Sequence, residues 1–239
     1  MMLGTILNVI TVIIGTALGT VLGSKLPQRL RQTVISGLGL FTMALGVQMF
    51  LNTQNSLIVL GSILIGAVLG EWWQIEEGLE GFGAWLQKKV SSNQDQNEGR
   101  ERFIKGFLTA SLVFCVGPVT VLGAIQDGLS GDISLLAVKS TLDGFAALAF
   151  SSTLGIGVGF ATIPILVYQG IITLLAQQMQ SIMTEPMIAE MTATGGVLLM
   201  GIAISGLLEL RKIRVGNFLP ALVVAPLMVA LLTWFGVMK

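Results

Sequence analysis

Long apolar segments constrain this chain more than any other feature of its sequence. A helix needs about 20 mostly apolar residues to cross ~30 Å of hydrocarbon. Hydrophobic residues make up 53% of the 239-residue chain and charged residues only 11%, which is more apolar side chain than one soluble core can bury. The sequence therefore predicts an all-α integral membrane protein with about eight transmembrane helices. The predicted segments are Leu3 to Ser24, Thr33 to Leu51, Ser56 to Gly70, Phe103 to Gln126, Ile133 to Ser152, Gly155 to Ala176, Met191 to Leu210 and Phe218 to Phe235.

Positive charge in the loops predicts the orientation of these segments, because Lys and Arg in short loops stay in the cytoplasm. If eight crossings alternate, eleven of the thirteen basic residues fall on one side, and only Lys139 and Lys239 lie elsewhere. We therefore expect both termini outside. The loops expected in the cytoplasm are Lys25 to Gln32, Lys88 to Arg102 and Arg211 to Val215.

The hydroxyl run Ser151, Ser152 and Thr153 interrupts the apolar stretch 133–176. This stretch forms either two full crossings or two half-helices that re-enter on the same side, so the eight predicted helices include broken or re-entrant ones as an alternative. Both alternatives keep the orientation of the later loops. A single crossing would place the basic loop at Arg211 outside, against the charge bias.

Glycine-rich matches within the chain predict an internal repeat. Such matches also arise by chance. In the second of the two sets given below, however, the matched segments would run in opposite directions through the membrane. That is typical of the inverted-topology repeats of secondary transporters, whose solute site lies at the repeat interface. The matched sets are Gly4, Gly15 and Gly19 with Gly144, Gly155 and Gly159, and Thr33, Gly37 and Ala44 with Thr192, Gly196 and Ala203.

Asp143 is the acidic residue expected deepest in the membrane. It follows Ile133 by ten residues, which at ~1.5 Å per residue places it about 15 Å deep, near the midplane. An acid at that depth costs on the order of 3 kcal/mol, so it needs a partner or a function. Lys139 lies four residues earlier on the same helical face. The two residues either form a pair that only orients the helix or belong to a solute or proton site.

The Gly117-Pro118 pair predicts a kink or break in its helix, because proline removes a backbone donor and clashes with the preceding turn. Unwound backbone at membrane depth can coordinate ions or solutes. Asp127 lies at the outer end of this segment, in either a solvated loop or an acidic vestibule. Gln169 is a single polar residue in an apolar helix, where an interhelical hydrogen bond is the commoner use.

Composition shifts divide the chain into four consecutive parts. Residues 1–70 are a first three-helix membrane unit, and 71–102 are a cytoplasmic amphipathic helix with a polar linker. The connecting broken helix occupies 103–132, and 133–239 form a second membrane unit with the inverted repeat. The acidic face of the amphipathic helix favours protein contact over anionic lipid for its apolar stripe.

The residue types present exclude most enzyme chemistry. The chain has no histidine and one cysteine, Cys115, so His-based triads, His zinc sites and CxxC redox pairs are absent. No phosphate-binding GxxxxGK[ST] loop occurs. Thirteen basic residues balance thirteen acidic ones, which argues against nucleic acid as a partner. We expect no enzyme activity, no cofactor and no metal.

Several runs resemble the bacterial YqgA/YdfK-type family, which is catalogued as a domain of unknown function. They are "GTILNVITVIIGTALGTVLG" from Gly4, "CVGPVTVLGAIQDGLSGD" from Cys115, "LLAVKSTLDG" from Leu135 and "IPILVYQGIITLLA" from Ile163. The resemblance implies a multi-pass protein of the bacterial cytoplasmic (inner) membrane, described at most as a candidate transporter. It supplies no catalytic residues.

The leading hypothesis is a secondary transporter or channel for a small, unidentified solute or ion. The alternative is a non-transport membrane scaffold or signalling accessory protein, and a dry bundle with Asp143 sealed onto Lys139 would favour it. Besides the lipid bilayer we expect a homodimer, because small residues leave grooves that a second copy can fill. The candidate substrate-binding or ion-binding residues are Asp143, Lys139, Gly117, Pro118, Asp127, Ser151, Ser152, Thr153 and Gln169.

Overall fold

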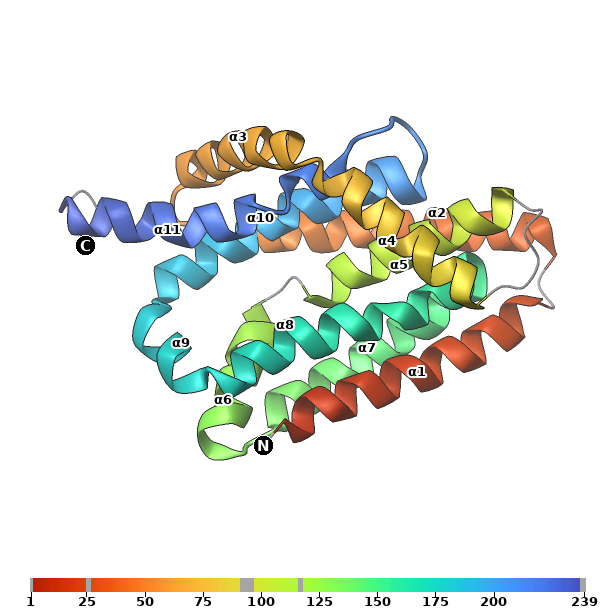
Figure 1. Ribbon diagram of the computed structural model, residues 1–239, viewed down its shortest axis with the longest axis horizontal. Coiled ribbons are helices and arrows are strands. Elements are labelled where there is room, and N and C mark those ends of the chain that lie inside the picture. Colours follow the sequence, from red (N-terminus) through yellow and green to blue (C-terminus); the bar gives the residue numbers. More distant parts are fainter. Residues whose placement is uncertain (1, 25–26, 91–96, 116–117, 237–239) are drawn as a thin grey trace. The chain divides into compact units, whose positions relative to one another are not determined.

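The computed structural model describes residues 2–24, 27–90, 97–115 and 118–236, and every regular element in these ranges is a helix (Figure 1). The fold is therefore all-α, as the apolar segments predict. The α-helices are α1 (Leu3–Ser24), α2 (Gln28–Phe50), α3 (Ser56–Trp73), α4 (Ile75–Val90), α5 (Asn97–Cys115), α6 (Pro118–Ser130), α7 (Ser134–Leu154), α8 (Thr162–Leu174), α9 (Ala176–Ile182), α10 (Glu185–Ile202) and α11 (Ala221–Trp234). Short 3₁₀ helices occupy η1 (Ile156–Ala161) and η3 (Val215–Phe218), and a π-helical turn, η2 (Ala203–Leu207), follows α10.

Six helical segments in the described ranges are long and apolar enough to cross a membrane, or seven if the bent pair α5 and α6 counts as one span. All of them overlap predicted segments. The predicted segment Ile133 to Ser152 forms α7, which is long enough to cross a membrane but is less apolar than these six segments. Its polar residues, Lys139 and Asp143 among them, explain the difference.

The chain forms two compact units, and each combines two separate stretches of sequence. Unit 1 comprises the described residues within Met1–Leu38 and Glu80–Gln180, and unit 2 those within Gly39–Leu79 and Ser181–Lys239. The boundaries fall inside α2 and α4, so both helices contribute to both units. The division into four consecutive parts, which was inferred from composition, stays a prediction.

In unit 1, α1 lies against α7 along its length, and the two run parallel (Figure 1). Along α1, Gly4 faces Leu136, Gly15 faces Gly144 and Gly23 faces Ser152. Both sets of numbers rise together, which defines the parallel direction. Small residues let the two backbones approach closely, which is how membrane helices pack without a hydrophobic driving force.

The helix α8 also packs on α1, in the opposite direction. Asn8 contacts Gln169, whereas Gly159, ten residues earlier than Gln169, faces Thr16 further along α1. A turn at Gly155, with a φ of 80° that favours glycine, separates α7 from η1 and α8. The stretch 133–176 therefore forms two antiparallel helices alongside α1.

In unit 2, α3 packs antiparallel to α11, because Gly61 faces Met228 and Gly70 faces Asn217. One end of this pair is held by polar contacts. Glu71 pairs with Arg214 at 2.5 Å and accepts a hydrogen bond from the Asn217 side chain at 2.7 Å. These contacts fix the end of α3 against the start of the last apolar segment.

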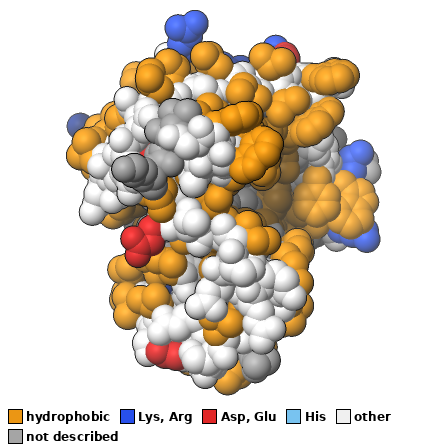
Figure 2. All heavy atoms as spheres, turned by 90° about the vertical axis from the view of Figure 1, so that its left-hand side faces the viewer, with side chains coloured by type: hydrophobic (Ala, Val, Ile, Leu, Met, Phe, Trp, Pro, Cys, Tyr) orange, Lys and Arg blue, Asp and Glu red, His pale blue; other side chains and the backbone are white. Residues whose placement is uncertain are grey.

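The outer surface of the described chain is strongly apolar. Figure 2 shows hydrophobic side chains across the face in view, with few charged ones among them. On α1, Ile10, Ile13 and Leu18 are each about half exposed, and on α7 Phe145 is 70% exposed. Such side chains need lipid as their solvent, as expected for a membrane protein.

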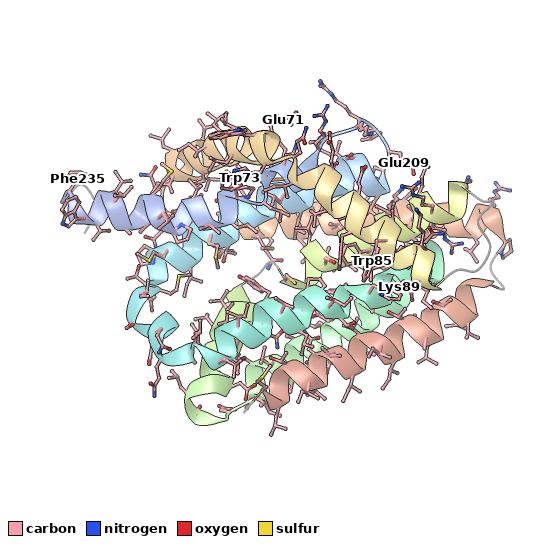
Figure 3. The ribbon with its side chains drawn as sticks, viewed as in Figure 1. Glu71, Trp73, Trp85, Lys89, Glu209 and Phe235 are labelled. Carbon is pink, nitrogen blue, oxygen red and sulfur yellow. The ribbon has the colours of Figure 1, made fainter. Side chains whose placement is uncertain are left out.

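The amphipathic helix predicted after Trp72 forms α4, and the second half of its apolar stripe packs within unit 1. Leu86 is buried with Phe103 and Phe107 of α5, and the Phe82 ring lies 5.9 Å from that of Phe107. Trp85 stays half exposed, with the Lys89 ammonium 4.3 Å from its ring (Figure 3). The chain therefore covers the stripe at Leu86, whereas Phe82 remains 40% exposed and Trp72 79% exposed.

Candidate functional site

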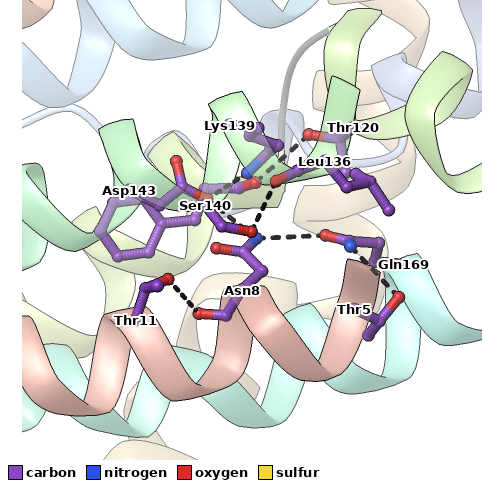
Figure 4. Close-up of polar contacts among 10 residues, drawn as sticks. Thr5, Asn8, Thr11, Thr120, Leu136, Lys139, Ser140, Asp143 and Gln169 are labelled. Atoms are coloured by element: carbon purple, nitrogen blue, oxygen red, sulfur yellow. Dashed lines mark hydrogen bonds and ion pairs between the residues drawn. The ribbon is translucent and has the colours of Figure 1, made fainter. Parts of the chain in front are cut away.

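A buried polar network occupies unit 1 where α1, α7 and α8 meet (Figure 4). Asn8 of α1 and Gln169 of α8 are fully buried, and Lys139 and Asp143 of α7 retain only 8% exposure each. Buried polar groups at membrane depth require partners, because lipid offers none. The network supplies most of them.

The Asp143 carboxylate is the centre of the network. Its Oδ2 atom accepts hydrogen bonds from the Lys139 ammonium and, at 3.0 Å, from the Asn8 side-chain amide. Lys139 and Asp143 therefore form the pair that their four-residue spacing predicted, because this spacing brings both side chains onto one face of α7. Asn8 is added from α1, whose glycines allow the close approach to α7.

From Asn8 the network continues toward the start of α1. Asn8 Nδ2 also donates to Gln169 Oε1 at 3.2 Å, and Gln169 Nε2 donates to the Thr5 hydroxyl at 3.1 Å. The Thr173 hydroxyl donates to the Gln169 carbonyl at 3.0 Å and lies 3.5 Å from the Thr5 hydroxyl. Because the Thr173 hydroxyl proton already bonds the Gln169 carbonyl, the Thr5 hydroxyl is the donor to the Thr173 oxygen.

These bonds fix the orientation of the Asn8 amide. Both of its N–H groups face acceptors, Asp143 Oδ2 and Gln169 Oε1, so reversing the amide would place oxygen against oxygen. The remaining atom, Asn8 Oδ1, is buried and has no hydrogen-bond partner among the described residues. The amide that bonds Asp143 therefore carries one spare acceptor.

Asp127 occupies a separate place, at the start of α1. It is fully buried, and its Oδ2 accepts a hydrogen bond from the Gly4 amide at 3.1 Å. A carboxylate at a helix N-terminus satisfies an otherwise unpaired N–H group and interacts favourably with the helix dipole. Its second oxygen, Oδ1, has no partner in the described part of the chain. The solvated-loop alternative is thus wrong for Asp127.

That alternative does describe the neighbours of Asp127. Gln126 donates to Asp132 at 2.6 Å in an exposed contact. The Ser134 hydroxyl and amide, with this Gln126 bond, hold the pKa of the Asp132 carboxyl below its usual range. The three polar residues at this end therefore divide into one buried acid and an exposed turn.

The helix break predicted at Gly117-Pro118 falls between α5 and α6, whose axes differ by 61°. Gly117 itself lies outside the described residues, and α6 begins at Pro118. Both α5 and α6 pack on α7 and α8. The break therefore borders the network.

The hydroxyl run of α7 lies about two turns beyond Asp143 and is not part of the network. Ser151, Ser152 and Thr153 each donate to a carbonyl of their own helix three residues earlier. Ser151 also faces Gly19 of α1, where the helices approach closely. On α1 itself, Thr16 and Thr20 have hydroxyls without partners among the described residues.

The candidate site residues named from the sequence did not include Asn8, Thr5 or Thr173. Their spacing could have indicated a shared polar face. Thr5 and Asn8 are three residues apart on one apolar helix, and Gln169 and Thr173 are four residues apart on another. In the described ranges no group of three or more His, Cys, Asp or Glu side chains could hold a metal ion. What the network offers is oxygen acceptors and one buried ion pair.

The apolar helices and their buried polar network define a multi-pass helical membrane protein. The chain belongs to the family described as "Protein of unknown function (DUF554)", whose profile matches residues 3–230. It is 32% identical over 239 residues to "Uncharacterized protein YqgA" of Escherichia coli (strain K12), covering 99% of this chain and 100% of that protein.

The chain is also similar to "Uncharacterized membrane protein YdfK" of Bacillus subtilis (strain 168), with 28% identity over 239 residues, 98% of this chain and 99% of that protein. No solved structure matches the chain. The resemblance stated from sequence runs is thereby confirmed, and it extends over nearly the whole chain.

Proposed function

We propose that this protein is a secondary transporter or channel that moves a small solute or ion across the bacterial cytoplasmic membrane. The observation that carries the proposal is the buried Asp143 network of α1, α7 and α8, with its unpaired acceptor on Asn8. Ionisable residues inside a membrane are expensive, and they commonly mark ion or solute pathways.

The polar groups of unit 1 also extend along the helix axes and are not confined to the surroundings of Asp143. From Asp143 the network reaches Thr5 and Thr173, and Asp127 bonds α1 one residue before Thr5. In the other direction the unpaired hydroxyls of Thr16 and Thr20 continue along α1. A line of polar groups through an apolar bundle supports passage of a polar species.

Eight crossings with both termini outside are part of the proposal. The helix α7 lies along the whole of α1, so the two reach the same depth, and α1 is apolar enough to span. The parallel α1 and α7 and the antiparallel α3 and α11 run in the directions that strict alternation requires. The loop charges supply the orientation.

For the inverted repeat, only the second matched set is retained in the proposal. It pairs α2 with α10, and within unit 2 these helices run antiparallel, with Gly46 facing Gly196 and Gly39 facing Leu208. The first set aligns α1 with the end of α7 and η1, which is not one helix.

The scaffold alternative predicts Asp143 sealed onto Lys139, and their buried contact fits that prediction. Against it, the α4 stripe that would dock a partner is covered in part, because Leu86 is buried with Phe107 within unit 1. The homodimer stays a prediction. Several of the glycines that would line a groove, such as Gly15 and Gly19, are used within the chain against α7.

The test is flux through proteoliposomes. Purified protein is reconstituted, and uptake of alkali cations, protons, and small neutral and anionic solutes is compared with that of protein-free liposomes. We expect flux of at least one species, and its loss in Asn8→Ala, which removes the amide that links Asp143 to Gln169. Asn52→Ala, at an exposed asparagine, is the matched control and should retain flux. No flux of any species, or equal flux in both variants, would contradict the proposal.

A further inference from the structure

A hollow lies on the outer face of α3, along the last two turns of that helix. Its described lining is Ala67, Val68, Glu71 and Trp72, and its volume is about 510 Å³. These four positions share one face of the helix, because residues four apart lie above one another. Ala67 and Val68 give the hollow an apolar part, and Glu71, in the last turn of α3, gives it a polar end (Figure 3).

The hollow lies where α3 is expected to leave the hydrocarbon of the membrane. The helix is apolar enough to cross, and it ends at Trp72 and Trp73, which are 79% and 62% exposed. Tryptophan at the end of a span lies at headgroup level. Val68, one turn earlier, is 68% exposed and belongs to the apolar part of the span. The hollow therefore joins the headgroup layer to the acyl-chain layer.

An ion pair within unit 2 forms the polar end of this hollow. The Glu71 carboxylate pairs with the Arg214 guanidinium at 2.5 Å and accepts a hydrogen bond from the Asn217 side chain at 2.7 Å. These contacts hold the carboxylate in place, yet the side chains of Glu71 and Arg214 stay 60% and 57% exposed. Each carboxylate oxygen has a second lone pair, and a guanidinium has five N–H donors. A ligand can therefore reach a fixed negative charge and a positive charge beside it.

We infer that the hollow binds the headgroup of a zwitterionic aminophospholipid, with phosphatidylethanolamine as the lipid to test. The lipid ammonium donates a hydrogen bond to Glu71 and lies against the Trp72 ring. The lipid phosphate accepts from Arg214, and an acyl chain follows the apolar part of the hollow. The ion pair thus matches the two charges of the headgroup with opposite signs. This lipid site is independent of the transport proposed above.

Other common headgroups match only part of the hollow. Phosphatidylglycerol has a phosphate for Arg214 but no cation, so the Glu71 carboxylate would repel it. Phosphatidylcholine has a cation without an N–H group, so it can lie against Trp72 but cannot donate to Glu71. Arg211 and Lys212 are exposed in the same loop as Arg214 and attract any phosphate. Selectivity must therefore come from the ammonium.

Binding of lipids to the purified protein tests this inference. Full-length protein is stripped of lipid in a mild detergent and titrated with the three phospholipids, all with the same acyl chains. Native mass spectrometry counts the lipids bound to each chain. We expect one phosphatidylethanolamine per chain, bound at least about tenfold more tightly than the other two, because only it makes the charged hydrogen bond to Glu71. Equal binding of all three, or a preference for phosphatidylglycerol, would overturn the inference.

Matched variants assign the site to named residues, with thermal unfolding without lipid as the check on folding. Trp72→Ala should weaken phosphatidylethanolamine binding at least about fivefold, whereas Trp72→Phe, which keeps an aromatic face, should retain most of it. Trp73→Ala is the control, because this neighbouring exposed tryptophan does not line the hollow. Equal effects of Trp72→Ala and Trp73→Ala would overturn the inference.

The carboxylate is tested through headgroup preference, which a general loss of stability does not change. Glu71→Gln keeps a hydrogen-bond acceptor for Arg214 but removes the negative charge. This variant should bind phosphatidylethanolamine and phosphatidylcholine with about equal affinity, because a neutral amide attracts the two cations alike. A folded Glu71→Gln variant that keeps the full preference for phosphatidylethanolamine would exclude Glu71 from the site and overturn the inference.

Discussion

The buried carboxylate of Glu190, on α10, accepts a hydrogen bond from the Thr53 hydroxyl at 2.7 Å, although 137 residues separate the two in sequence. Its other oxygen accepts the backbone amides of Gln54 at 2.7 Å and Asn55 at 2.9 Å. The connection between α2 and α3 is therefore held to α10 within unit 2. Three donors on one carboxylate compensate the cost of burying its charge.

Replacing this carboxylate should be strongly destabilising. In Glu190→Ala, two backbone amides and a hydroxyl lose their charged acceptor, and we expect a loss of about 3 kcal/mol in the free energy of unfolding. Glu185→Ala, at an exposed acid in the first turn of the same helix, should cost less than about 1 kcal/mol. Melting temperatures in detergent compare the two. Equal shifts would mean that the contacts of Glu190 contribute nothing specific.

The charge pair of α7 should respond to single and double changes in opposite ways. Asp143→Asn leaves the Lys139 ammonium buried without its counter-ion and should cost about 3–5 kcal/mol. The double change Lys139→Met with Asp143→Leu removes both charges and should restore most of the stability. Chemical or thermal unfolding measures the cycle. A double variant no more stable than Asp143→Asn would show that the two residues are not coupled.

The local parts of this fold could be predicted from the sequence. Proline at Pro118 indicated the helix break, and the spacing of Lys139 and Asp143 indicated their shared face, because both effects act within one turn of a helix. Residues that act on their immediate neighbours were thus correctly interpreted.

Partners that are distant in sequence could not be predicted in the same way. Asn8 meets Asp143 across 135 residues, and Asp127 meets Gly4 across 123. For Asp127 the sequence left a solvated loop and an acidic vestibule as alternatives, and the structure buries the residue at the start of α1. Glu190 was overlooked because nothing within α10 shows that the turn before α3 will supply its donors. Such pairings depend on which helices pack together, and one sequence does not specify that.

Close packing of α1 on α7 predicts a sharp difference between two glycine substitutions. A Cβ at Gly19 would collide with the Ser151 hydroxyl and the Leu148 carbonyl, whereas a Cβ at Gly81 of α4 meets nothing within 4 Å. Gly19→Ala should therefore destabilise the protein by about 1–3 kcal/mol. Gly81→Ala should be neutral or stabilising by about 0.5–1 kcal/mol, because alanine favours the helix. Melting temperatures that move together would argue against the contact.

The exposed turn before α7 should give a small, pH-dependent contribution to stability. Hydrogen bonds from Ser134 keep the pKa of Asp132 below the 3.8 expected for an unperturbed carboxyl. The folded-state pKa is the lower one, so the contribution is present above pH 3.8 and is lost as the pH falls through the folded value. Ser134→Ala should lower the melting temperature slightly at pH 6 but not at pH 3. A difference that stays constant with pH would contradict this assignment.

Cysteine labelling tests the proposed orientation in intact cells. In a Cys115→Ala background, Asn52→Cys should react with a membrane-impermeant maleimide, because the turn between α2 and α3 is expected outside. Lys88→Cys and Lys212→Cys, both at exposed positions, should react only after the cells are permeabilised, since basic loops remain in the cytoplasm. Lys212 is the decisive position, because its side depends on whether the stretch 133–176 crosses the membrane an even number of times. Labelling of Lys212→Cys from outside, with Lys88→Cys protected, would mean that this stretch crosses only once and would remove α7 from the set of spanning helices.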